Sequence, residues 1–188
     1  MAELPPIWFL RHGQTEWNLE GRLQGHKDSP LTALGRSQAA RQARILPDIL
    51  QRVATGAGGC FASPLGRAQE TARIALAGRG FVTDPRLSEI ATGDWEGRLR
   101  AEVATGEGDL FLYAGAPGGE GLDALQARVA AFLAELEGPS VVVSHGLLGK
   151  VLRGQACGLD AQAMDRLSNL QGAVYLLENG EETVLEAP

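Results

Sequence analysis

Four side chains that can carry a positive charge follow three short apolar runs in this sequence. They are Arg11 and His12 after residues 7–10, Arg67 after residues 60–62, and His145 after residues 141–143. If the three runs are neighbouring parallel strands, their carboxyl ends open onto one crevice, where open α/β sheets bind ligands. Cationic groups can share a pocket only with an anion, and phosphate matches the planar guanidinium fork. Histidine is the reactive group of this set.

His12 is the predicted nucleophile, although taken alone it would also fit a buried core histidine. Attack by a ring nitrogen requires a neutral imidazole whose other nitrogen donates to a fixed acceptor, often a backbone carbonyl. A phosphohistidine intermediate would divide one difficult displacement into two easier ones. Arg11 and Arg67 are the predicted phosphate ligands. Arg67 falls in the first turn of a predicted helix, where free backbone N–H groups favour an anion.

Residues 11–18 (RHGQTEWN) resemble the opening motif of the histidine phosphatase (phosphoglycerate mutase-like) superfamily. Further matches follow in the family's order at residues 31–35 (LTALG), 62–68 (ASPLGRA), 87–89 (LSE) and 144–146 (SHG). The resemblance covers roughly residues 5–155. Residues 93–97 (GDWEG) look like the phosphatase branch of the family. The mutase branch has an aromatic residue where Thr92 stands and an arginine pair farther on, whereas residues 106–120 contain no arginine.

The resemblance implies roles for further residues. His145 would donate a hydrogen bond to the phosphoryl oxygens as charge spreads in the transition state, and the backbone N–H of Gly146 would add another. Glu89 would be the general acid, which protonates the leaving alkoxide and then takes a proton from the attacking water. Asp94 and Glu96 are rival candidates for that role.

Two amides and two doubtful residues complete the candidate site. Asn18 and Gln24 are predicted substrate contacts because they lie in a polar, glycine-bounded loop. Gln24 equally fits a solvated loop residue. His26 lies in the same loop and receives no catalytic role. Residues 118–121 (GGEG) lack the serine that the family often has there, so no role is assigned to Glu120.

The composition is typical of one globular domain over residues 1–188. The net charge of −6 argues against nucleic acid or an anionic membrane as a partner. Cys60 and Cys157 are too few and too far apart for a disulfide framework or a zinc site. No signal-peptide pattern or membrane-length apolar run is visible, so a cytoplasmic location is predicted. No metal or cofactor is expected, and the oligomeric state stays open.

Alternating strand and helix patterns predict an α/β fold, a three-layer sandwich with a mostly parallel central sheet flanked by helices. The expected strands are residues 6–10, 60–62 and 141–143, with a closing hairpin of residues 172–177 and 182–186 around Asn179-Gly180. The expected helices are residues 33–46 after an N-cap at Thr32, a helix from Ser63-Pro64 to Gly78, and helices over residues 122–136 and 147–152. Pro47 should stop or kink the first of them. Residues 90–121 are expected to cover the active site, with a weak helix near residues 99–104.

These observations predict a metal-independent phosphomonoesterase that hydrolyses small phosphorylated metabolites through a phosphohistidine. The first alternative is a cofactor-dependent phosphoglycerate mutase, against which the missing arginine pair counts. The second is a non-catalytic phospholigand-binding module, against which the presence of both His12 and Glu89 counts. The resemblance implies small sugar phosphates, nucleotide-pathway intermediates and α-ribazole phosphate as candidate substrates, and it does not select among them.

Overall fold

A computed structural model describes residues 4–187. The strands are β1 (Ile7–Arg11), β2 (Cys60–Ala62), β3 (Val82–Thr83), β4 (Ser140–Ser144), β5 (Val174–Glu178) and β6 (Glu181–Leu185). The helices are α1 (Glu16–Glu20), α2 (Ala33–Ile45), α3 (Pro47–Thr55), α4 (Gly66–Ala75), α5 (Arg100–Val103), α6 (Asp109–Ala114), α7 (Leu122–Ala134), α8 (Gly146–Ala156) and α9 (Ala161–Arg166), with 3₁₀ turns η1 (Pro85–Leu87) and η2 (Gly93–Trp95).

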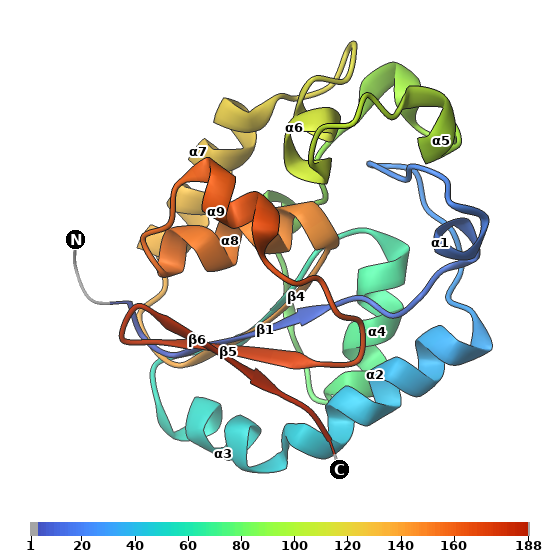
Figure 1. Cartoon of the computed structure of the whole chain (residues 1–188). Helices are drawn as coiled ribbons and strands as arrows, with labels where there is room; N and C mark the ends of the chain where they lie inside the picture. Colours follow the sequence, from blue (N-terminus) through green and yellow to red (C-terminus); the bar gives the residue numbers. More distant parts are fainter. Residues whose placement is uncertain (1–3, 188) are drawn as a thin grey trace.

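The strands form one sheet in the order β3-β2-β4-β1-β5-β6. β1, β2 and β3 run parallel to β4 or to one another, while β5 is antiparallel to β1 and β6 to β5. The register pairs Arg11 with Ser144 and Ala62 with Val143. The carboxyl ends of β1, β2 and β4 therefore lie side by side, and the predicted α/β class is confirmed (Figure 1).

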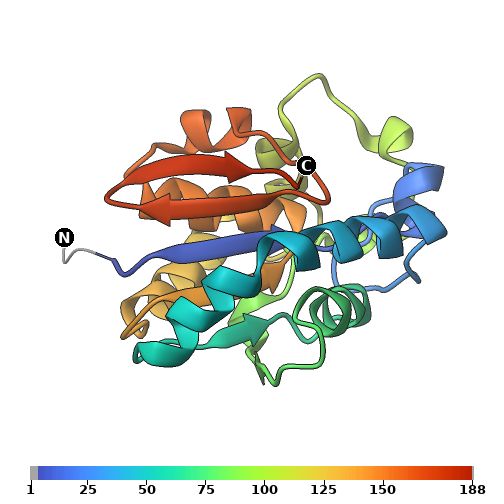
Figure 2. The same cartoon turned by 90° about the horizontal axis from the view of Figure 1, so that it is seen from below.

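Helices cover both faces of the sheet, with α7, α8 and α9 on one side and α2, α3 and α4 on the other (Figure 1). The side chains of β1 alternate between two hydrophobic clusters. Ile7 and Phe9 pack with residues of α7 and α8, whereas Trp8 and Leu10 pack with residues of α3 and α4. A continuous apolar run therefore forms a strand buried on both faces, as parallel sheets require. Figure 2 shows the β5–β6 hairpin flanking β1 on the opposite side from β4.

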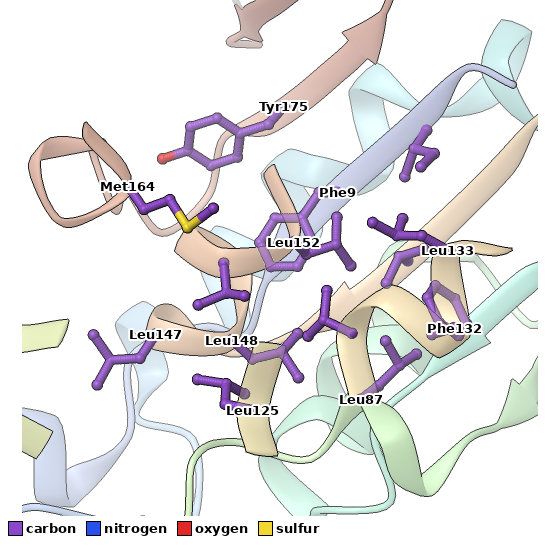
Figure 3. Packing of buried hydrophobic residues seen from close by; sticks show 14 of the residues in the cluster. Phe9, Leu87, Leu125, Phe132, Leu133, Leu147, Leu148, Leu152, Met164 and Tyr175 are labelled. Atoms are coloured by element: carbon purple, nitrogen blue, oxygen red, sulfur yellow. The ribbon is translucent and has the colours of Figure 1, made fainter. Parts of the chain in front are cut away.

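The larger hydrophobic cluster supports the helix that follows β4 (Figure 3). Phe9 of β1 and Leu148 and Leu152 of α8 are each at most 1% exposed. Burial of such a side chain stabilises the fold by about 1.5–3 kcal/mol. The cluster also contains Leu87, which lies two residues before Glu89. Core packing thus fixes both α8 and the segment that carries the predicted acid.

Local signals account for several element boundaries. The hydroxyl of Thr32 accepts a hydrogen bond from the backbone N–H of Gly35 and caps α2, as predicted. Pro47 separates α2 from α3, since a proline cannot continue the hydrogen-bond ladder of a helix. Asn179 and Gly180 have φ angles of 54° and 77°, which the tight β5–β6 turn requires.

The predicted helix start at Ser63-Pro64 is wrong, because α4 begins at Gly66. The backbone N–H of Ser63 still donates to the carbonyl of Val143, so Ser63 continues the sheet edge instead of capping a helix. No sequence pattern had indicated α6 and α9. Each has only six residues, which is too short for a clear apolar period.

Candidate active site

A pocket opens where β1 and β4 end, and we call it the central pocket. It is lined by Arg11, His12, Asn18, Arg22, Leu23, Gln24, Gly25, Arg67, Glu89, Ile90, Thr92, Asp109, Tyr113, Gly146, Leu147 and Asn169. Of the predicted site residues only His145 is not in the lining, and its ring centroid lies 5.2 Å from that of His12. The pocket therefore brings together residues that are up to 158 positions apart in sequence, which is the separation of Arg11 and Asn169.

His12 is held in one orientation at the end of β1. Its backbone N–H donates to the carbonyl of Ser144 at 2.9 Å, which extends the β1–β4 ladder by one step. Its Nδ1 lies 2.7 Å from the carbonyl oxygen of Gly13. A carbonyl only accepts, so Nδ1 carries the proton and Nε2 keeps its lone pair. Burial, then the charges of Arg67 and Arg11, lower the pKa of His12 well below 6.5. The ring is neutral at neutral pH.

Gly13 is required by a close approach of two backbones. A Cβ atom at Gly13 would lie 2.2 Å from the carbonyl oxygen of Gly35, at the start of α2. One at Gly35 would lie 2.1 Å from the carbonyl oxygen of Gln14. The two glycines therefore let α2 pack against the loop that carries the Gly13 carbonyl. This contact fixes the acceptor that orients His12.

His145 is fully buried beside His12 at the N-cap position of α8. Its Nε2 lies 2.6 Å from the hydroxyl oxygen of Ser63. Its Nδ1 is buried and has no hydrogen-bond partner within residues 4–187. Burial, then the charge of Arg67, lower the pKa of His145 well below 6.5. Both rings are neutral, which avoids two adjacent buried charges.

Arg11 points into the central pocket from the last position of β1. Its Nη1 donates to the carbonyl of Asn169 at 2.6 Å, and its buried Nε has no partner among the described residues. A Cβ atom at Gly146 would lie 2.7 Å from Nδ2 of Asn169 and 3.4 Å from Nε of Arg11. Gly146 therefore keeps the start of α8 open to the pocket. Burial lowers the pKa of Arg11, and an arginine still remains charged.

The guanidinium group of Arg67 holds the loop between α1 and α2 in place. Nη1 donates to the carbonyl of Lys27 and to Oδ1 of Asp28, and Nη2 donates to the carbonyl of Gly25. The side chain is about 1% exposed, and its buried Nε has no partner in the described part of the chain. One edge of the fork is therefore used by the protein. The other edge, with Nε, is available to a ligand.

Glu89 reaches the N-terminus of α8 from the segment after η1. Its Oε1 accepts from the backbone N–H groups of Leu148 at 2.9 Å and Ile90 at 3.0 Å. Among residues 4–187, its Oε2 accepts one bond, from the N–H of Leu147 at 3.1 Å. The carboxyl group therefore stands in the pocket lining in a fixed orientation. Oε2 is the oxygen with the greater free capacity.

Asn18 and Gln24 both line the central pocket, where they were predicted. Asn18 forms a capping box with Thr15 in α1, and its Oδ1 also accepts from Gln171. This fixes the amide and leaves its nitrogen for a ligand. Gln24 is 8% exposed, and its Oε1 has no partner within residues 4–187. The interpretation of Gln24 as a solvated loop residue is therefore wrong.

The two rival carboxylates do not line the central pocket. Oε1 of Glu96 accepts from the backbone N–H of His26 at 2.8 Å and so supports the loop. Asp94 is exposed. His26 also lies outside the lining, but its Nε2 is 2.9 Å from the carbonyl oxygen of Glu89. It contacts the backbone of the predicted acid and not its carboxyl group.

Residues 90–121 contribute Ile90, Thr92, Asp109 and Tyr113 to the pocket lining. Backbone hydrogen bonds between Leu23 and residues 97–98 attach this segment to the loop after α1. Nothing in the sequence singled out Asp109 or Tyr113. Burial, then the charge of Asp109, raise the pKa of Tyr113 to about 12, so its hydroxyl is neutral and can donate.

Glu120 does have a structural role, contrary to the expectation from its motif. Its carboxylate accepts from Nε and Nη2 of Arg128 at 2.7 and 2.9 Å. Partial burial opposes ionisation, but the bonds from Arg128 and from the N–H of Ala91 lower the pKa of Glu120. Arg128 lies in the amphipathic pattern of α7, where an arginine suggests only a solvated face. Sequence reasoning therefore missed it.

The two buried histidines should make the stability of the protein depend on pH. Below pH 6.5, His12 and His145 take up protons in the unfolded chain but stay neutral in the folded protein. The free energy of unfolding therefore falls as the pH falls. The slope approaches about 1.4 kcal/mol per pH unit for each histidine as the pH falls well below 6.5. Chemical unfolding in phosphate-free buffer between pH 7 and 5.5 measures it. The His12→Gln variant should lose one histidine's share of the slope, and an unchanged slope would contradict the burial argument.

The sequence model of the histidine phosphatase superfamily (branch 1) matches residues 7–186. The chain belongs to this superfamily. The predicted resemblance is thereby confirmed over a longer stretch than the motifs covered. Probable phosphoglycerate mutase GpmB from Enterobacter sp. (strain 638) is 37% identical over 182 residues, covering 86% of this chain and 79% of the relative.

Other similar proteins are named either as a phosphatase or as a phosphoglycerate mutase. Adenosylcobalamin/alpha-ribazole phosphatase from Escherichia coli (strain K12) is 33% identical over 172 residues, covering 84% of this chain and 82% of the relative. The crystal structure of phosphoglycerate mutase from Thermus thermophilus superposes with a TM-score of 0.74 at 34% identity, covering 97% of this chain and 99% of that one. The comparisons thus support a phosphatase or mutase activity and do not specify the substrate.

None of the helices within residues 4–187 has the length and apolar character that a membrane span needs.

Proposed function

We propose that this histidine phosphatase is a metal-independent phosphomonoesterase that acts on small phosphate esters through a phosphohistidine. The observation that carries the proposal is the bond from Nδ1 of His12 to the carbonyl of Gly13, which leaves Nε2 as the nucleophilic nitrogen. Nε2 attacks phosphorus, the phosphorus–oxygen bond to the alcohol breaks, and the phosphoryl group stays on Nε2. Water then displaces it and releases inorganic phosphate.

The charge of the transferring group is met by protein cations and N–H donors. In this mechanism, the phosphoryl oxygens accept hydrogen bonds from the Nε atoms of Arg11 and Arg67, which have no partner among the described residues. The hydroxyl oxygen of Ser63 accepts from the N–H of Leu65, so the hydroxyl group can donate a hydrogen bond to Nε2 of His145. Nδ1 of His145 then carries the ring proton and donates to an equatorial oxygen. Such preorganised donors stabilise a transition state without reorganising. The guanidinium groups of Arg11 and Arg67 also supply the positive charge that a metal ion provides in other phosphatases.

Glu89 is the proposed general acid and base. Its Oε2 accepts a single backbone hydrogen bond, so this oxygen is the one assigned to carry the proton. The proton passes to the alkoxide oxygen as that oxygen leaves phosphorus. In the second half of the reaction, the ionised carboxylate takes a proton from the attacking water, which restores the starting state.

Hydrolysis is favoured over the mutase alternative by the part of the central pocket that Asp109 and Arg22 line. A mutase acting on phosphoglycerate must hold a carboxylate. Asp109 lines this part of the pocket, and its partner Arg100 is already bonded to it at 2.5 and 2.9 Å. Arg22 is bonded to Glu20 and to the carbonyl of Gly97. A carboxylate-bearing substrate would therefore meet the carboxylate of Asp109 and one arginine, Arg22, that already has partners.

Turnover assays test the proposal directly. Purified protein should release inorganic phosphate from both p-nitrophenyl phosphate and propyl phosphate. For each substrate, the rate should be the same with and without EDTA. Isomerisation of 3-phosphoglycerate, with 2,3-bisphosphoglycerate present, should be much slower than hydrolysis of these two esters, which carry no carboxylate. Efficient isomerisation would establish the mutase instead. Binding of phosphate esters without turnover of any of them would establish a phospholigand-binding module.

The name of the adenosylcobalamin/alpha-ribazole phosphatase relative supports α-ribazole phosphate as one candidate among the small phosphorylated metabolites. A screen of phosphorylated metabolites against the purified protein, scored by phosphate release, would identify the preferred ester.

Arg67 offers a test of phosphate recognition by a guanidinium fork. Arg67→Lys keeps one positive charge but loses the planar fork that reaches the carbonyls of Gly25 and Lys27 through separate nitrogens. We expect kcat/KM to fall about 10²-fold, the usual effect of losing one transition-state donor, and to fall further in Arg67→Ala. The control is Arg73→Lys, an exposed position on the same helix, which should retain wild-type activity. Wild-type kcat/KM in Arg67→Lys would rule out the fork.

A further inference from the structure

One side chain of α7, Arg128, is bonded to two backbone carbonyls beside the proposed acid. Nη1 of Arg128 donates to the carbonyl of Arg86 at 2.6 Å, and Nη2 donates to the carbonyl of Glu89 at 3.1 Å. The same guanidinium forms the two-bond ion pair with Glu120. Arg128 therefore joins the segment that ends at Glu89 to Glu120, near the two ends of residues 90–121.

Glu120 completes the arrangement at the next residues. Oε2 of Glu120 accepts from the N–H of Ala91 at 3.0 Å, and the N–H of Glu120 donates to the carbonyl of Ala91 at 3.0 Å. One ion pair thus binds the backbone on both sides of Glu89. Its side chains are only 19% and 17% exposed, so solvent screens the pair weakly. Neither Arg128 nor Glu120 lines the central pocket, so neither touches the substrate.

We propose that the Arg128–Glu120 pair positions Glu89 for proton transfer, an inference that rests on the proposed role of Glu89 as the acid. The carboxyl group of Glu89 can accept from α8 only while the backbone of residues 89–91 stays in place. Without the pair, the carbonyl of Glu89 keeps only its contact with His26. A misplacement of about 1 Å at a reacting group lowers a rate by about 10²-fold.

The adjacent arginine provides a matched control. Arg86 belongs to the same segment and is likewise bonded to acidic groups, Asp84 and Glu135, and to the carbonyl of Ala131. It therefore attaches the segment to α7 without contacting any atom of residues 89–91 in these bonds. If the Arg128 pair acted only by holding the segment to α7, loss of Arg86 and loss of Arg128 would have the same kind of effect.

The experiment compares two leaving groups in Arg128→Gln, Glu120→Gln and Arg86→Gln. Propyl phosphate needs a proton on its leaving oxygen, whereas p-nitrophenyl phosphate hardly does. We expect kcat/KM for propyl phosphate to fall about 10–10²-fold more than for p-nitrophenyl phosphate in Arg128→Gln. Glu120→Gln retains an acceptor oxygen and should show the same selectivity in a milder form. Arg86→Gln should change both substrates by one common factor.

Three outcomes decide the matter. Partial unfolding removes active enzyme and lowers both rates equally, so equal losses in Arg128→Gln and Glu120→Gln would overturn the inference in favour of a structural role. In the Glu89→Gln background, adding Arg128→Gln should produce no further selective loss, and a full additional selective loss would also overturn it. If Glu89→Gln itself shows no selectivity, the proposed acid fails, and a selective loss in Arg128→Gln alone would then point to another acid.

Discussion

We expect His12→Ala to lose at least about 10⁴-fold in kcat, because the variant has no nucleophile and every turnover passes through that residue. The fold should survive, since the β1–β4 ladder at this position is made by the backbone N–H of His12. Rapid quenching of the wild-type enzyme during turnover should trap phosphate on the protein that is labile to acid and stable to base. The bond from Nδ1 to Gly13 further predicts that the phosphate is on Nε2.

His145→Gln is the matched control for this experiment, because His145 is an equally buried ring 5.2 Å away. It should react more slowly and still become labelled at His12. Phosphorus-coupled NMR of the ring protons distinguishes the two nitrogens. Label on His145, on a serine or on an aspartate would refute the assignment. Label on Nδ1 would refute the tautomer derived from the Gly13 contact.

Glu89→Gln should slow hydrolysis of propyl phosphate by about 10²–10⁴-fold, the usual contribution of general acid catalysis. The loss for p-nitrophenyl phosphate should be far smaller, because p-nitrophenolate is a weak base and leaves without a proton. The comparison uses kcat/KM, which reports the steps up to the first irreversible one. A shared slow dephosphorylation of the phosphohistidine therefore cannot mask the difference.

The rival carboxylates supply the controls for Glu89. Glu96→Gln keeps an oxygen that can accept from the N–H of His26, and Asp94→Asn alters an exposed residue outside the central pocket. Both variants should affect the two substrates by the same factor. Equal losses for the two substrates in Glu89→Gln would exclude it as the acid. A selective loss in Glu96→Gln would transfer the role to Glu96.

The sequence was sufficient for the features that local patterns determine. The apolar runs at residues 7–10 and 141–143 predicted buried strands, because only a strand covered on both faces tolerates continuous hydrophobicity. Each strand is followed at once by a histidine and a glycine. Parallel pairing of the strands then places both histidines at one edge of the sheet. Superfamily, fold class and the location of the candidate residues around one site followed from these short motifs.

Other features were decided by the tertiary structure. The sequence suggested that Ser63 caps a helix, but its backbone continues the sheet and its hydroxyl contacts His145. The bonds of Arg128 to Glu89 and to Glu120 join residues 39 and 8 positions apart, and no periodicity marks them. A strand, a turn or a cap depends on neighbours in sequence and can be read from them. A buried hydrogen bond between separate segments depends on how those segments pack, which is why the orientation of the acid and the supports of both histidines were visible only in the folded chain.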